Sequence, residues 1–247
     1  MERILRKYWS PYVQYNWKYG LFLILLFGVP RFILVLHSYV IQSYGTVMLV
    51  FLAMWFTPLI FLTKQGRKSI GIQHPKSYIR LCSSFIAGAL SCVIIFLLLL
   101  LLFDTTQENA FVYISGNSSK GAINTIDKQS YFWIAALPSM IFSPIGEEFL
   151  YRGIIHGSFV KQFGETKASI FDSLAFALTH IAHFGIIYIA GTWLLLPFPT
   201  IIWVISMFIV SQIFFKCKQF SGSIWGAVAA HSGFNFAMMY LIVYELS

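Results

Sequence analysis

The sequence predicts an all-α membrane protein, a polytopic helical bundle of about seven to eight transmembrane segments around an intramembrane polar cavity. Of the 247 residues, 58% are hydrophobic and only 11% are charged. Soluble domains contain about 45–50% apolar and about 25% charged residues. The apolar residues form continuous runs such as 93–103, unlike the short alternating segments that are typical of membrane β-barrels.

The N-terminal half is expected to contain an interfacial segment and three spans. Residues 1–18 interleave Arg and Lys with Trp and Tyr, which suits a cytoplasmic membrane interface because aromatic rings settle at headgroup depth. Spans are expected at about 19–41, where Pro30 and Arg31 interrupt the run, at 46–63 and at 81–103.

Loop charge predicts the orientation. Residues 64–80 contain Lys and Arg but no acid, whereas residues 104–130 carry the cations Lys120 and Lys128 and a net charge of −1. Since short cytoplasmic loops are enriched in Lys and Arg, we place the N-terminus and 64–80 in the cytoplasm and 104–130 outside. This orientation accounts for the net charge of +8, so we expect no nucleic-acid partner.

The C-terminal half is expected to hold a fourth helix from Tyr131 to near Lys161, a fifth over 166–184 and a last one over 222–244. Residues 186–215 allow two alternatives, namely two short helices separated at Pro197-Phe198-Pro199 or one long broken helix. If Lys216 and Lys218 mark a cytoplasmic helix end, the chain must cross the membrane an odd number of times between 186 and 215 in both alternatives. We expect one membrane-embedded domain over 1–247, with a catalytic core at about 80–245.

The most informative segment is Glu147 to Arg152, which places three charges in an otherwise apolar helix. Charge inside a membrane costs at least a few kcal/mol per group and usually marks a functional site. Glu148 and Arg152 are four residues apart, so they share a helix face and can pair. Glu147 points about 100° away from Glu148 and can face a cavity. Pro144 and Gly146 indicate a kinked or locally opened helix.

Two further motifs follow on later helices. Phe176 and His180 are four residues apart, as are His231 and Asn235. A carboxylate and a histidine can hold a water molecule and take its proton, and a His and an Asn one turn apart can direct donors at an oxyanion.

Each motif also has a purely structural interpretation. The Glu and Arg residues can lock helices as a buried ion pair. His180 can be a hydrogen-bonded core histidine, and His231 and Asn235 can join helices by hydrogen bonds. Asp172, rotated about 80° from His180 on the same helix, is expected to have a structural or near-interface role. Arg31 either reaches the membrane surface or neutralises a buried acid.

The order of these motifs resembles the CPBP family, which comprises CAAX proteases and bacteriocin-processing enzymes and is also called the Abi family. The residues that carry the resemblance lie within 147–235 and are Glu147, Glu148, Arg152, Phe176, His180, His231 and Asn235. The resemblance implies an intramembrane endopeptidase of about eight helices around a water-filled cavity open toward the cytoplasm.

The resemblance also implies roles for the site residues. Glu147 and His180 activate the hydrolytic water, and His231 and Asn235 stabilise the oxyanion. Glu148 and Arg152 support them as a pair.

The family was long described as metalloproteases, and we expect no cofactor. The alternative is zinc held by Glu147, His180 and His231, because a catalytic zinc takes about three protein ligands and a water molecule. Against zinc, the sequence lacks the signature of two His at i and i+4 around a Glu, and Asn235 is a poor zinc ligand.

The function predicted from these observations is cleavage of a membrane-associated or lipidated peptide at the cell membrane, in contact with membrane lipid. A peptide pheromone or bacteriocin precursor is the leading substrate class. The alternative is a non-catalytic immunity or scaffold protein that binds a peptide or a partner. A transporter is a third hypothesis, although no internal repeat supports it.

Overall fold

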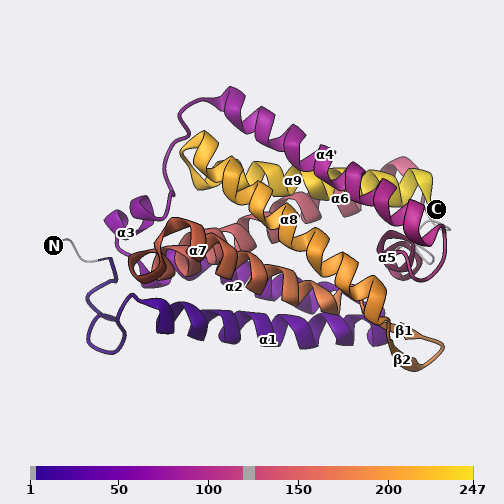
Figure 1. The fold of residues 1–247 in the computed structure, drawn as a ribbon, viewed down its shortest axis with the longest axis horizontal. Helices are drawn as coiled ribbons and strands as arrows, with labels where there is room; N and C mark the ends of the chain where they lie inside the picture. The colour runs from indigo at the N-terminus through magenta and orange to yellow at the C-terminus, as the bar shows by residue number, and fades with distance from the viewer. Residues whose placement is uncertain (1–3, 119–125, 247) are drawn as a thin grey trace.

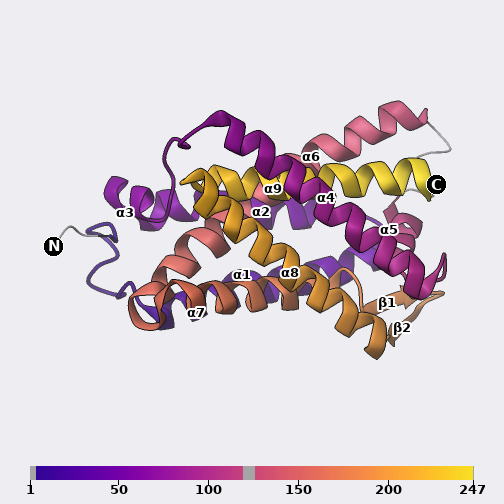
Figure 2. The ribbon, with the colours of Figure 1, turned by 45° about the horizontal axis from the view of Figure 1, so that its top comes forward.

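The computed structural model describes residues 4–118 and 126–246 and shows long helices lying along one axis (Figures 1 and 2). The helices are α1 (Trp17–Ile41), α2 (Gly45–Phe61), α3 (Lys64–Ser69), α4 (Tyr78–Phe103), α5 (Ala110–Ser118), α6 (Lys128–Glu148), α7 (His156–Thr179), α8 (Pro197–Ser221) and α9 (Ile224–Tyr240). The π-helical segment η1 (Phe149–Ile155) joins α6 to α7, the 3₁₀ turn η2 (His180–Ala182) follows α7, and the π-helical segment η3 (Leu241–Glu245) extends α9.

A helical membrane bundle is confirmed. By length and composition, the described residues contain four helices suited to cross a membrane, Trp17–Ile41, Tyr78–Phe103, Pro197–Ser221 and Ile224–Glu245. The predicted seven to eight segments exceed this number, because α2 is apolar but only 17 residues long and the helices from α6 to α7 carry the charged motif. The total number of crossings therefore stays a prediction.

Residues 186–215 follow neither predicted alternative. Strands β1 (Ile186–Ile189) and β2 (Thr192–Leu195) form an antiparallel hairpin. Ala190 and Gly191 between them both have positive φ, 50° and 84°, as a type I′ turn requires. The two prolines then begin α8 instead of breaking it, because the first helical turn does not need their missing N–H groups.

The two predicted loops also contain short helices. Within 64–80 lies α3, and within 104–130 lies α5. Asp127 starts α6 by accepting a hydrogen bond from the Ser130 amide at 2.9 Å, which lowers the pKa of its carboxyl group. The first three residues of the predicted interfacial segment, and Lys120 of the predicted outside loop, lie outside the described residues.

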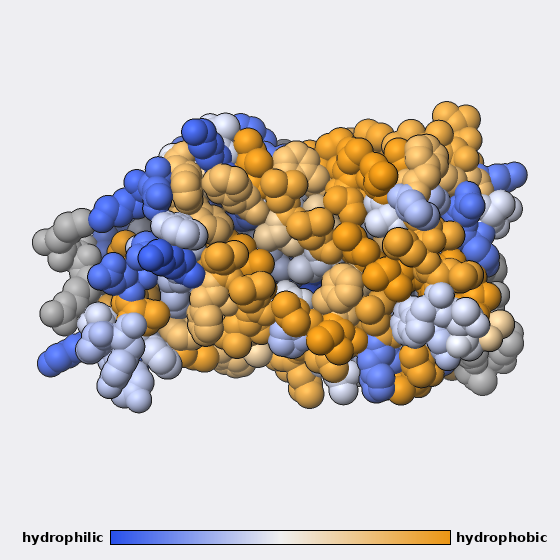
Figure 3. Space-filling view, turned by 60° about the horizontal axis from the view of Figure 1, so that its bottom comes forward, coloured by the Kyte–Doolittle hydropathy of each residue, from blue (hydrophilic) through white to orange (hydrophobic). Residues whose placement is uncertain are grey.

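Apolar side chains cover the middle of the molecule, and hydrophilic residues gather mainly toward the end that carries the N-terminus (Figure 3). Large apolar side chains such as Ile33, Ile94, Leu101 and Ile134 are exposed on the helix surfaces. Contiguous apolar surface of this extent is unusual for a soluble monomer, and it is the surface that a bilayer would cover.

Helices α4 and α9 cross at very short range (Figure 1). A Cβ atom added to Gly88 of α4 would lie 1.7 Å from the Ala230 carbonyl oxygen, and one added to Gly233 of α9 would lie 2.0 Å from the Phe85 oxygen. Small residues let helix backbones approach closely inside membranes. This crossing fixes α9, and with it His231 and Asn235, against the rest of the bundle.

We therefore expect Gly88→Val to lower the free energy of unfolding by at least about 1–3 kcal/mol, the usual cost of overpacking. Leu90→Val is the matched control, because Leu90 lies two residues away on α4 and is 57% exposed. Thermal unfolding of the two variants in detergent measures the difference. Equal stability of both variants would contradict the close crossing.

Candidate active site

The acidic motif lies where α6 changes into a π-helix. Glu147 and Glu148 end α6, and η1 begins at the next residue. Gly146 allows α6 to approach α2, since a Cβ atom there would lie 2.6 Å from the Phe51 carbonyl oxygen. The predicted local opening is therefore present just beyond Pro144 and Gly146, as a π-helical segment of the kind that often occurs at functional sites.

Glu147 is fully buried and has three polar neighbours. Its Oε1 forms an ion pair with Arg31 Nη2 at 2.8 Å. The Ser143 hydroxyl donates to its Oε2 at 2.6 Å, and His231 Nε2 lies 3.7 Å from the same oxygen. The carboxylate thus has a counter-ion from α1, and one of its oxygens faces an imidazole just beyond hydrogen-bond range.

Glu148 forms the predicted pair with Arg152, with 3.2 Å between Arg152 Nε and Glu148 Oε2. Its other oxygen, Oε1, lies 2.9 Å from His231 Nδ1. A carboxylate oxygen only accepts, so His231 donates its Nδ1–H to Glu148 and turns Nε2 toward Glu147. Glu148 therefore orients the histidine between the two carboxylates.

Arg152 is enclosed by aromatic rings and polar groups. Its guanidinium lies 4.4 Å from the centre of the Phe176 ring and donates to the Ser211 hydroxyl. Asp172 lies 3.9 Å from Arg152 and binds His156 Nδ1 at 2.7 Å. Asp172 thus belongs to a buried network behind Arg152, in agreement with the structural role expected for it.

His180 lies on the other side of Arg31. Its Nδ1 is 2.7 Å from the Phe176 carbonyl oxygen, so Nδ1 carries the proton and Nε2 is left with a lone pair. That Nε2 lies 3.5 Å from Arg31 Nη2, the nitrogen that also binds Glu147. Arg31 thus stands between Glu147 and His180, for which the structure shows no direct contact.

Asn235 lies one turn after His231 on α9. Its amide donates one hydrogen bond to the Ser139 carbonyl oxygen at 2.7 Å. Because the amide has two N–H groups, one of them is left for another acceptor.

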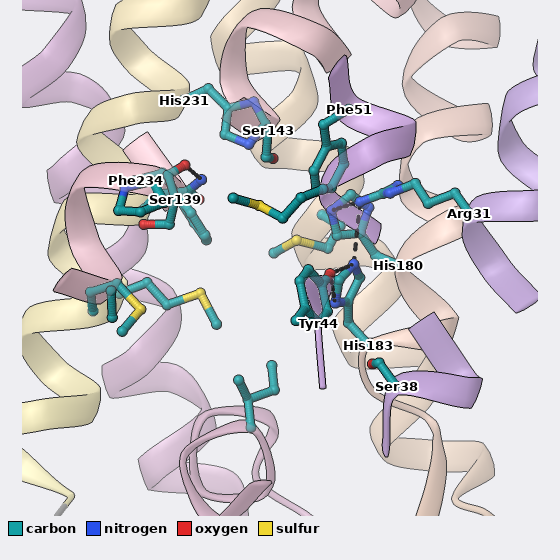
Figure 4. A pocket seen from close by; sticks show the side chains of 18 of the residues that line it. Arg31, Ser38, Tyr44, Phe51, Ser139, Ser143, His180, His183, His231 and Phe234 are labelled. Atoms are coloured by element: carbon teal, nitrogen blue, oxygen red, sulfur yellow. Dashed lines mark hydrogen bonds between the residues drawn. The ribbon is translucent and has the colours of Figure 1, made fainter. Parts of the chain in front are cut away.

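These groups border a cavity of about 410 Å³. Figure 4 shows Ser143 and His231 on one side of it and Arg31, His180 and His183 on the other. Glu147 lies just behind this wall, since it is fully buried and its polar neighbours Arg31, Ser143 and His231 line the cavity.

The structure brings Glu147, Glu148, Arg152 and His231 into one connected cluster, with His180 joined to it through Arg31. Sequence reasoning left the role of Arg31 open between two alternatives, and neutralisation of a buried acid is what the structure shows. An arginine in the middle of an apolar run was the available signal. His183 lies 3.2 Å from Arg31; its spacing of one turn from His180 was the signal in the sequence, and its position near a predicted helix end favoured an ordinary solvated histidine.

The zinc ligands considered from the sequence do not form a metal-binding group. In residues 4–118 and 126–246, no three His, Cys, Asp or Glu side chains are arranged to hold a metal ion. Glu147 is already paired with Arg31, and the same cation faces His180. A cationic guanidinium between two ligand positions is a poor fit to zinc, so no step of the reaction is derived through it.

The cavity lies in the half of the bundle that contains the end of α1, the end of α7 and helix α5. Its lining includes Gln42, Ser43 and Tyr44 from the α1–α2 connection and Asn117 from α5. Among the described residues, no lining residue comes from the basic loops, which lie at the other end of the bundle (Figure 1). The side of the membrane toward which the cavity opens stays a prediction.

Fold and site together define a helical membrane protein with paired buried carboxylates, arginines and histidines beside an internal cavity. Residues 129–237 match the family model described as type II CAAX prenyl endopeptidase Rce1-like. This range contains all three motifs, so the predicted resemblance is confirmed for this segment. The match supports a membrane endopeptidase. No curated protein and no solved structure matches the chain.

We expect Arg31→Gln to destabilise the protein, because removing one partner of a buried ion pair costs about 3–5 kcal/mol. The double variant Arg31→Gln/Glu147→Gln removes the unpaired charge and should recover part of this loss. Unfolding measured in detergent for both variants tests the pair. A double variant no more stable than the single one would contradict a direct Arg31–Glu147 interaction.

Proposed function

We propose that the protein is an intramembrane endopeptidase that hydrolyses peptide bonds of a membrane-associated or lipidated peptide. The observation that carries this proposal is the 3.7 Å separation between Glu147 Oε2 and His231 Nε2, with His231 lining the cavity and Glu147 directly behind it. This separation is too long for a hydrogen bond, and a water molecule beside the two atoms can contact both.

Glu147 is the proposed general base. It takes a proton from a water molecule as the water oxygen attacks the scissile carbonyl carbon, and the proton then passes to the amine that leaves. The Ser143 hydroxyl, bound to Glu147 and lining the cavity, connects the carboxylate to the cavity. His180 assists through the lone pair of its Nε2, which the hydrogen bond from Nδ1 to Phe176 fixes and which Arg31 Nη2 approaches at 3.5 Å.

His231 and Asn235 are the proposed oxyanion donors. Glu148 binds His231 Nδ1 and fixes the ring; when Nε2 also carries a proton, its N–H is directed to donate to the developing negative charge. Asn235 supplies its remaining N–H from the same face of α9. Arg152 compensates the charge of Glu148 and holds it in place without reaching the substrate.

The cellular context that we propose is a multi-pass protein of the cell membrane with a cytoplasmic N-terminus. The basic residues of the N-terminal segment and of 64–80 fit contact with anionic lipid headgroups. Maturation of a peptide pheromone or bacteriocin is the leading process, as the family resemblance suggests. The alternative is an immunity or scaffold protein that uses the same cavity to bind a peptide or a partner.

Glu147→Gln separates catalysis from binding, because it keeps the shape of the side chain and removes the base. We expect cleavage of a membrane-associated peptide, followed by mass spectrometry, to fall by about 10²-fold or more, as for loss of a general base. Glu108→Gln is the matched control, since this carboxylate is exposed and lies in the connection between α4 and α5, away from the buried network. Undiminished cleavage by a correctly inserted Glu147→Gln protein would rule out Glu147 as the base.

We also propose a reaction without zinc. Because a cation already pairs with Glu147, cleavage by the purified protein in liposomes should persist when a strong zinc chelator is added. The assay is run in parallel with a soluble zinc protease as a control for chelation. Loss of cleavage that added zinc restores would overturn the metal-free mechanism.

A further inference from the structure

We infer that the peptide enters the cavity from the extracytoplasmic end of the bundle, an inference that rests on the proposed endopeptidase function for its substrate. The substrate class would then be an exported or outer-leaflet peptide with apolar residues beside the scissile bond. Three independent features of the structure lead to this side of access.

The first feature is the separation of charge along the long axis. At the end where α3 and the N-terminal segment lie (Figures 1 and 2), named here the basic end, cations dominate. This end carries Arg6, Lys7, Lys18, Lys64, Arg67, Lys68, Lys76, Arg80, Lys161, Lys167, Lys216 and Lys218, with Glu165 as its exposed acid among the described residues. The opposite end carries Asp104, Glu108, Asp127 and Glu245 with Lys128. The excess of Lys and Arg places the basic end in the cytoplasm.

The second feature is where each helix contributes to the cavity. Helix α1 lines it only from Arg31 onward, and α6, which starts at the opposite end, lines it only as far as Ser143. Helix α9, which starts at the basic end, contributes only from His231 onward. Among the described residues, no lining residue comes from the connections at the basic end. The cavity thus occupies the extracytoplasmic half.

The third feature is that the cavity is closed toward the cytoplasm and open on the other side. Between the ion pairs and the basic end, η1 is tightly packed, and its residues Leu150, Tyr151 and Ile154 are fully buried. At the opposite end, Gln42 and Ser43 line the cavity and are exposed. A peptide arriving from the cytoplasm would have to pass both the packed layer and the two Glu–Arg pairs.

The lining residues also show which helices an entering peptide would meet at the extracytoplasmic end. Helices α2 and α6 are in contact near the site, where Trp55 Nε1 donates to the Phe142 carbonyl oxygen at 2.7 Å. Nearer the extracytoplasmic end, residues of both helices, Met48 of α2 and Ala135 and Pro138 of α6, line the cavity. With Met238 on α9, the lining offers flexible thioether side chains that adapt to apolar segments of varied shape.

Thiol labelling in intact cells tests this inference without requiring catalysis. In a background with Cys82, Cys92 and Cys217 replaced by Ala, single cysteines are introduced as Met48→Cys and Met238→Cys in the cavity. Ser43→Cys marks the proposed mouth, and Ser69→Cys on α3 marks the basic end. The probe is a charged maleimide that does not cross membranes.

We expect Ser43→Cys and at least one cavity cysteine to be labelled from outside, and Ser69→Cys only after the membrane is permeabilised. Labelling of both cavity cysteines only after permeabilisation, labelling of neither, or outside labelling of Ser69→Cys would overturn extracytoplasmic access. A second measurement uses proteoliposomes sorted for one orientation, in which an apolar peptide added from the Ser43 side should be cleaved and blocked by labelling the cavity. Correct labelling without any cleavage would count against the proposed function and leave the side of access intact.

Discussion

Charge compensation inside an apolar bundle is the constraint on which the rest of this structure depends. Two carboxylates adjacent in sequence each have their own arginine, Glu147 with Arg31 of α1 and Glu148 with Arg152 of η1. An uncompensated charge at this depth would cost several kcal/mol. The two pairs therefore connect α1, α6 and η1, and the contact of Glu148 with His231 extends this connection to α9. The polar cluster holds the helices in register while its edge faces the cavity.

The tight crossing of α4 and α9 serves the same cluster. Glycines at both contact points bring the backbones together, and the histidine and asparagine on α9 are thereby held opposite the end of α6. His231 also stacks on Phe214 of α8 at 4.8 Å between ring centres, so packing and hydrogen bonding both fix its ring. Groups held in this way need little rearrangement when charge develops, which is the condition for electrostatic stabilisation of a transition state.

The helical membrane architecture and the Glu148–Arg152 pair could be predicted because both follow from local spacing in the sequence. The partner of Glu147 could not, since Arg31 and Glu147 are far apart in the chain and only tertiary packing brings them together. From the sequence, Pro197 and Pro199 could either break a helix or begin one. A β-hairpin precedes them in the structure, so they begin α8. The position of the cavity along the bundle could not be predicted either, because its lining combines residues of α1, α2, α5 and α6 that only tertiary packing brings together.

Arg31 also shows that the site depends on residues outside the segment that matches the family model. The recognised segment, 129–237, contains both glutamates, but the counter-ion of Glu147 comes from a helix more than a hundred residues upstream. Tyr44 and Phe51, likewise outside that segment, complete the cavity wall. Transplanting the segment into another protein would carry an unneutralised acid with it. The functional unit is therefore larger than the motif-bearing region, because α1, α2 and α5 also contribute to the site.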